Sequence, residues 1–109
     1  MGIDVQTLTG PMLDTLKPVL AKYWGEVQDY AKTEAVKMAH TLANIESLKA
    51  AGKIGEAQAV ALLDMQKQSM QAVLMAVEGI GLIAAQTAIN AALAAVKDTV
   101  NKLLGFGLL

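Results

Sequence analysis

Apolar side chains recur at helical spacing through the first half of the chain. Between residues 18 and 51 they follow one another at alternating steps of three and four, close to the 3.6-residue period of an α-helix. The apolar row is Leu20, Trp24, Val27, Ala31, Ala35, Met38, Leu42 and Ile45, and the opposite polar row is Lys22, Asp29, Lys32, Thr33, Lys37, His40, Asn44 and Ser47. This separation predicts an amphipathic helix over 18–51. We expect Pro18 to open the helix, because proline is tolerated in a first turn but not in an interior.

A second helical region follows after Gly52 and Gly55, which predict a left-handed C-cap and a turn. It covers residues 56–104 and contains no proline. Gly79 and Gly81 are the positions that would interrupt it, since glycine costs about 1 kcal/mol relative to alanine inside a helix. Several polar residues nevertheless share one sector of a single helical wheel across these glycines: Asp64, Gln71, Glu78, Gln86 and Asn90. We therefore expect one continuous helix, with a break at the glycines as the alternative.

These elements predict an all-α fold of a single domain. The expected architecture is a helical hairpin of two long helices, or a three-helix arrangement if the second helix breaks, packed in an oligomer. Residues 1–17, with Gly10 and Pro11, are expected to form an arm or a short helix. Residues 105–109 form an apolar tail after a glycine C-cap, and such a tail frays unless it docks on something.

Composition narrows the classes of function. Apolar residues make up 54% of the chain and charged residues 17%, and the net charge is −1. All nine basic residues are lysines, so the arginine that usually reads guanine and phosphate is missing, which argues against nucleic-acid binding. The absence of cysteine excludes disulfides and thiolate catalysis. We expect no secretory signal peptide, because no basic region followed by an apolar run opens the chain.

Residues 68–96 carry a single formal charge, at Glu78. The length would suit a membrane span, but the apolar side chains contribute only about −3 kcal/mol to insertion and a central acid costs about 2.5 to 3.5 kcal/mol. We therefore favour a helix buried among protein helices. In the alternative, an oligomeric membrane assembly, Glu78 would face a lumen and would be the candidate functional polar residue.

Small residues recur through the same stretch at spacings that let helix backbones approach closely. They predict a packing interface between copies of the chain, formed by Ala72, Ala76, Gly79, Gly81, Ala84, Ala88 and Ala92.

The sequence contains no pattern of residues that is typical of a catalytic site. His40 is the single histidine and lies on the polar row beside Lys37, without convergent metal ligands. Acid and base pairs three residues apart, such as Glu34 with Lys37, are expected to mark a solvated face. We expect no enzyme activity, no cofactor and no metal.

The favoured function is a non-enzymatic structural subunit that packs with copies of itself, in a large assembly such as a virion or an injection apparatus. Other assembly proteins are further candidate partners. The alternative from another class is a membrane-inserting pore, holin-like or translocation component, although we consider a membrane partner the less favoured choice. A third hypothesis is an adaptor whose groove receives a helix of another protein. The sequence leaves the cellular location undetermined.

Overall fold

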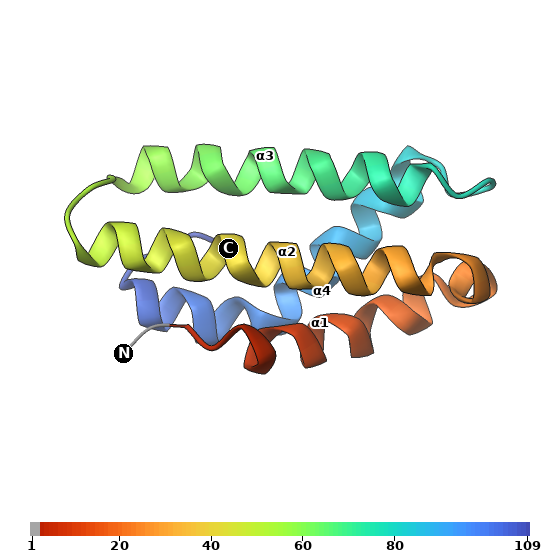
Figure 1. Cartoon of the computed structure of the whole chain (residues 1–109), viewed down its shortest axis with the longest axis horizontal. Helices are drawn as coiled ribbons and strands as arrows, with labels where there is room; N and C mark the ends of the chain where they lie inside the picture. Colours follow the sequence, from red (N-terminus) through yellow and green to blue (C-terminus); the bar gives the residue numbers. More distant parts are fainter. Residues whose placement is uncertain (1–2) are drawn as a thin grey trace.

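Four α-helices and one short 3₁₀ turn make up the protein in a computed structural model that describes residues 3–109. The helices are α1 (Val5–Val19), α2 (Trp24–Ala50), α3 (Glu56–Met75) and α4 (Leu82–Leu104), and the 3₁₀ turn η1 covers Ala21–Tyr23. Successive helices run in opposite directions and form a bundle measuring 42 × 22 × 18 Å (Figure 1). Each helix packs on the next in the cyclic order α1, α2, α3, α4, and α2 also contacts α4, so the all-α prediction is confirmed for the described residues.

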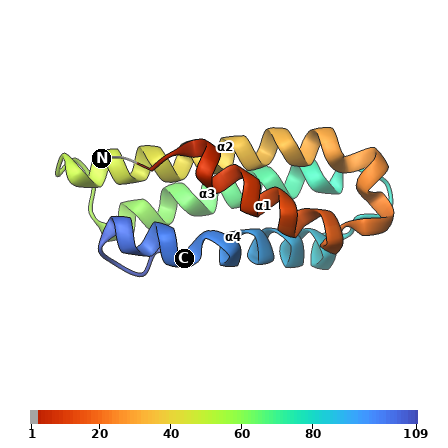
Figure 2. The same cartoon turned by 90° about the horizontal axis from the view of Figure 1, so that it is seen from below.

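The first helix is the largest departure from the expected layout. Residues 1–17 were expected to be an arm or a short helix, and α1 is a helix of 15 residues that extends to Val19 and lies along both α2 and α4 (Figure 2). Pro18 was expected to open a helix, yet it lies in the last turn of α1, and Pro11 lies in the middle. The carbonyls that lose their helical donor belong to Thr7 and Asp14, which are both exposed, so water can satisfy them.

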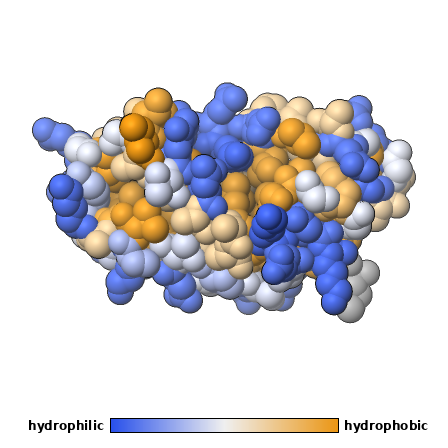
Figure 3. Space-filling model, turned by 180° about the vertical axis from the view of Figure 1, so that it is seen from behind, coloured by the Kyte–Doolittle hydropathy of each residue, from blue (hydrophilic) through white to orange (hydrophobic). Residues whose placement is uncertain are grey.

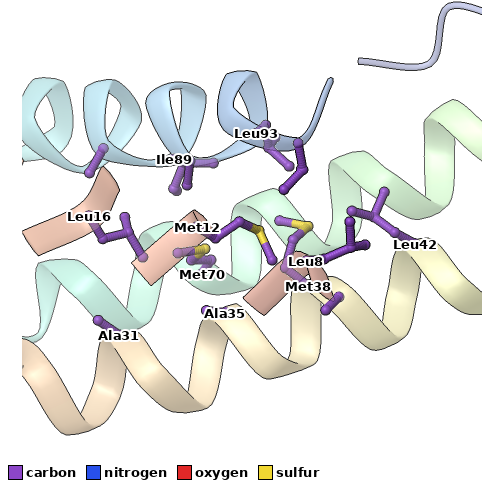
Figure 4. Packing of buried hydrophobic residues seen from close by; sticks show 14 of the residues in the cluster. Leu8, Met12, Leu16, Ala31, Ala35, Met38, Leu42, Met70, Ile89 and Leu93 are labelled. Atoms are coloured by element: carbon purple, nitrogen blue, oxygen red, sulfur yellow. The ribbon is translucent and has the colours of Figure 1, made fainter. Parts of the chain in front are cut away.

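Helix α1 is held by its buried face and by its cap. Leu8, Met12 and Leu16 stand four residues apart and are buried between the other helices (Figure 4). The Asp4 side chain accepts a hydrogen bond from the backbone N–H of Gln6 at 2.9 Å, which caps the helix N-terminus. Packing therefore outweighs the local cost of the two prolines.

Helix α2 follows the sequence prediction closely along its length. The apolar row is buried apart from the half-buried Trp24, and every residue of the polar row is exposed. The helix begins at Trp24, however, because η1 and Leu20 separate it from α1. Gly52 has φ of 71° and follows the helix end, and α3 begins at Glu56 after Gly55, as expected.

The expected continuous helix over 56–104 is wrong, and the break lies at the predicted glycines. Helix α3 ends at Met75 and α4 begins at Leu82, so the chain reverses through residues 76–81. Gly79 adopts φ of 95°, in the left-handed region that other residues rarely adopt. A Cβ built on Gly79 would lie 2.8 Å from Cε1 of Tyr23, so glycine also makes room for the tyrosine ring of η1.

The apolar tail docks on its own bundle. Gly105 ends α4 with φ of 80°, which confirms the expected glycine cap. The chain then folds back, so that Leu108 is buried and the Asn101 side chain binds both backbone groups of Leu109. The Asn101 amide oxygen accepts from the Leu109 N–H at 2.9 Å, and the Asn101 amide nitrogen donates to the Leu109 carbonyl at 3.3 Å. The tail therefore needs no neighbouring chain to hold it.

Candidate functional site

The small residues predicted to form an interface fall into two groups. Ala88 and Ala92 are buried in the core of the chain itself, and Ala84 is half-buried. Ala72, Ala76, Gly79 and Gly81 are exposed at the end of α3 and in the turn that follows it. The α4 alanines let α4 approach its own bundle closely, whereas the second group remains available to another molecule.

The surface around the second group carries almost no charge. Fifteen residues between 68 and 96 are exposed, and Glu78 is the one ionisable residue among them. The uncharged surface, as we name it, consists of the other fourteen: Gln68, Ser69, Ala72, Met75, Ala76, Gly79, Gly81, Leu82, Ile83, Gln86, Thr87, Asn90, Ala94 and Ala95. Soluble helices normally place charged residues on their solvent side, so this surface is unusual.

Large apolar side chains on this surface lie in water. Ile83 is 79% exposed, Leu82 46% and Met75 40%. Met65, which lies outside the uncharged surface but on the same helix as Met75, is 67% exposed. The back of the molecule carries separate hydrophobic areas with hydrophilic side chains between them (Figure 3). Exposed apolar areas of this kind are candidate surfaces for association.

A polar groove of about 330 Å³ separates α3 from α4. It is lined by Asp64, Lys67, Gln68, Gln71, Gln86, Ile89 and Asn90. Four of the five polar residues that shared one sector of a continuous helical wheel line this groove, so they face each other across the break instead of running along one helix. Within residues 3–109, none of the polar side chains in the groove makes a hydrogen bond or an ion pair with the chain.

A second groove, of about 420 Å³, lies on the other side of α3 against α2. Met65 and Leu62 line it from α3, and Thr41 and Ile45 line it from α2. The Thr41 hydroxyl donates to the Gln66 side-chain oxygen at 3.4 Å, while Nε2 of Gln66 is buried without a partner. Helix α3 therefore forms a ridge with a groove on each side.

Glu34 is a buried acid that the sequence pattern did not reveal. The pair with Lys37 was expected on a solvated face, and the ion pair exists, with 3.2 Å between Lys37 Nζ and Glu34 Oε2. Glu34 itself is only 1% exposed, so that expectation is wrong for the acid. Its other oxygen, Oε1, has no hydrogen-bond partner in the described part of the chain. Burying a carboxylate without full pairing costs free energy, so we expect Glu34 to add little to the stability of the bundle.

The two ionisable residues that drew attention in the sequence are both exposed. Glu78 lies in the turn between α3 and α4, and His40 lies on the outer side of α2. Over residues 3–109 no cluster of three or more acids or histidines is arranged to hold a metal ion. None of the helices in this part of the chain combines the length and the apolar character that crossing a bilayer requires.

Comparison of the chain with protein-family models, curated proteins and solved structures found no match.

Proposed function

We propose that this protein is a non-enzymatic structural subunit that self-associates through its uncharged surface. The observation that carries the proposal is the exposure of Met75, Leu82 and Ile83 on a surface where fourteen of fifteen exposed residues have no charge. Covering these side chains removes apolar area from water, which contributes about 25 cal/mol per Å². Membership of a large assembly, such as a virion or an injection apparatus, stays a prediction.

The proposal is narrower than the one that the sequence alone suggested. The sequence suggested that residues 68–96 form a helix buried among other helices in an oligomer. In the structure α1, α2 and the tail cover much of it, since residues such as Leu74, Ala88 and Val96 are buried within one copy. What remains for a partner is the outer side of α3 and the first half of α4. A folded monomer is therefore compatible with the bundle, and association adds to it.

The pore hypothesis loses the feature on which it depended. It required residues 68–96 to be one apolar helix with Glu78 near its centre. Those residues belong to two antiparallel helices and a turn, and Glu78 lies in the turn. Self-association needs no such refolding, so we favour it.

Light scattering on the purified chain tests the proposal. We expect a dimer or larger oligomer in buffer without detergent at micromolar concentrations, because association removes Met75, Leu82 and Ile83 from water. A strict monomer at every concentration would refute self-association. Oligomers that are recovered only in detergent would instead support the membrane hypothesis.

A further inference from the structure

Helix α3 carries two rows of uncharged residues, one on each side. The inner row contributes to the core through Ala59, Leu63, Met70 and Leu74. The outer row consists of Ala61, Met65, Gln68, Ala72 and Met75, and all five residues are exposed. We call these five residues the outer row of α3.

The outer row has the spacing of a coiled-coil seam. Its residues are separated by steps of four, three, four and three, which average 3.5 residues. Two helices that carry such a repeat pack along each other with their seams in register. Ala61 and Met75 are fourteen steps apart, so the row is about 21 Å long at 1.5 Å per residue. Its five residues provide five successive layers of contact.

The exposed side of α2 provides a comparison for the outer row of α3. Asp29, Thr33, Val36 and His40 follow the same steps, and Lys32 and Lys37 flank them. One acid, two lysines and an imidazole would have to be desolvated if this row were covered. The outer row of α3 contains no ionisable residue and is flanked by one acid, Asp64, so covering it desolvates fewer charges.

We propose that the outer row of α3 is the seam of an antiparallel coiled coil with α3 of a second copy. This rests on the proposed self-association and specifies its geometry. The result is a two-fold dimer in which eight helices form one body, with the two α3 helices at its centre. Gln68, the middle residue of the row, lies near the two-fold axis.

The chemistry of the row favours a second copy over an unrelated partner. A two-fold interface places a surface against itself, so that surface must not repel its own image. Ala61 and Ala72 allow close approach of the two helices, and Met65 and Met75 adapt to irregular gaps. The Gln68 amide has both donor and acceptor groups, so it can pair with its own equivalent across the axis. The grooves on either side of α3 receive side chains from the flanks of the partner helix.

Charge and dipole select the antiparallel direction. Asp64 flanks the outer row, and a parallel pair would bring it beside its own equivalent. With Gln68 at the axis, an antiparallel pair places Asp64 level with Ala72 of the second copy. The helix dipoles also oppose each other favourably in this direction.

Cysteine crosslinking tests this geometry, because the described chain contains no cysteine of its own. Gln68→Cys, Ala61→Cys, Asn90→Cys and Ser47→Cys would each be oxidised with copper phenanthroline, and the dimer band followed over time. A disulfide requires Cα atoms within about 7 Å, so Gln68→Cys should crosslink at least about ten-fold faster than the other three. Ala61 and its equivalent would lie about 21 Å apart along the seam. Ser47→Cys, on the outer side of α2, measures random collisions.

The outcomes separate this inference from the proposed function. Equal rates for Ala61→Cys and Gln68→Cys would overturn the antiparallel direction. A faster rate for Asn90→Cys than for Gln68→Cys, in a chain that light scattering shows to be a dimer, would overturn the α3 seam and leave self-association standing. A monomer by light scattering would overturn both.

Discussion

The N-terminal pair of helices and the C-terminal pair build one core but face water in different ways. Helix α2 buries its apolar row and exposes a row rich in charged residues, including Asp29, Lys32 and Lys37. Helix α3 and the first half of α4 also bury an apolar face, but from Gln68 onward their exposed residues carry no charge. Both pairs contribute to the core, but more large apolar side chains stay exposed on the second pair. Those of the second pair are Val60, Met65, Met75, Leu82, Ile83 and Leu103, and those of the first pair are Val19, Tyr30 and Val36.

This difference shows that α2 has about as much apolar surface as the core buries, whereas α3 and α4 have more. In α2 charge marks the solvent side at every position except that of the buried Glu34. In α3 the inner and outer rows are similar in polarity, so the helix can be covered on two sides. Surplus apolar surface on a bundle that is already closed is the physical basis for proposing association.

The largest effect is expected from damaging the inner side of α2. Leu42 is fully buried, and Leu42→Ala should lower the free energy of unfolding by about 2 to 5 kcal/mol, because it leaves a cavity in the core. Urea denaturation followed by Trp24 fluorescence would measure it. Val36→Ala on the outer side of the same helix should change stability by less than about 0.5 kcal/mol. Equal effects of the two substitutions would contradict the assignment of inner and outer sides.

A smaller effect is expected at the turn that separates the two C-terminal helices. Gly79→Ala should destabilise the bundle by about 1 to 3 kcal/mol, since alanine must adopt a positive φ and displace the Tyr23 ring. Gly81→Ala is the matched control, because a Cβ there meets no atom within 4 Å and φ is −87°. Thermal unfolding by circular dichroism would compare the two. If Gly79→Ala proved as stable as the control, the helix break would not depend on this glycine.

Glu34 is the charged residue of α2 that does not face solvent. We therefore expect replacement of Glu34 and replacement of its partner Lys37 to change stability by different amounts. Lys37→Met should lower the free energy of unfolding by about 1 to 2 kcal/mol, because it leaves a buried carboxylate unpaired. Glu34→Met should be neutral or stabilising by up to about 1 kcal/mol, because the lysine can then extend into water. Denaturation of the two variants at neutral pH would check this. A larger loss in Glu34→Met than in Lys37→Met would mean that Glu34 stabilises the bundle.

Much of α2 could be predicted from the sequence, because its charged residues mark the side that faces solvent. The polar row from Lys22 to Ser47 is exposed as expected, and Gly52 ends the helix. Helix α1 could not be predicted from local propensity, because Gly10 and Pro11 suggest a break. The signal that was available is the spacing of Leu8, Met12 and Leu16, which places three apolar side chains on one face.

The C-terminal pair was harder to predict, because its buried and exposed positions carry similar uncharged residues. Alanines such as Ala72 and Ala88 are alike in sequence, yet one is exposed and the other is buried. The polar residues that suggested a continuous helix gave the wrong answer, since two helices that face each other across a groove produce the same wheel. Glu34 gave no signal either, because an acid three residues before a lysine is normally solvated.

Sedimentation equilibrium on two matched variants tests the central claim most directly. Val36 on α2 and Met75 on α3 are 39% and 40% exposed, so replacing either with lysine adds the same charge at similar exposure. We expect the unmodified chain and Val36→Lys to associate with equal affinity, and Met75→Lys to sediment as a folded monomer. Equal association of all three chains would contradict the claim that the uncharged surface joins the subunits.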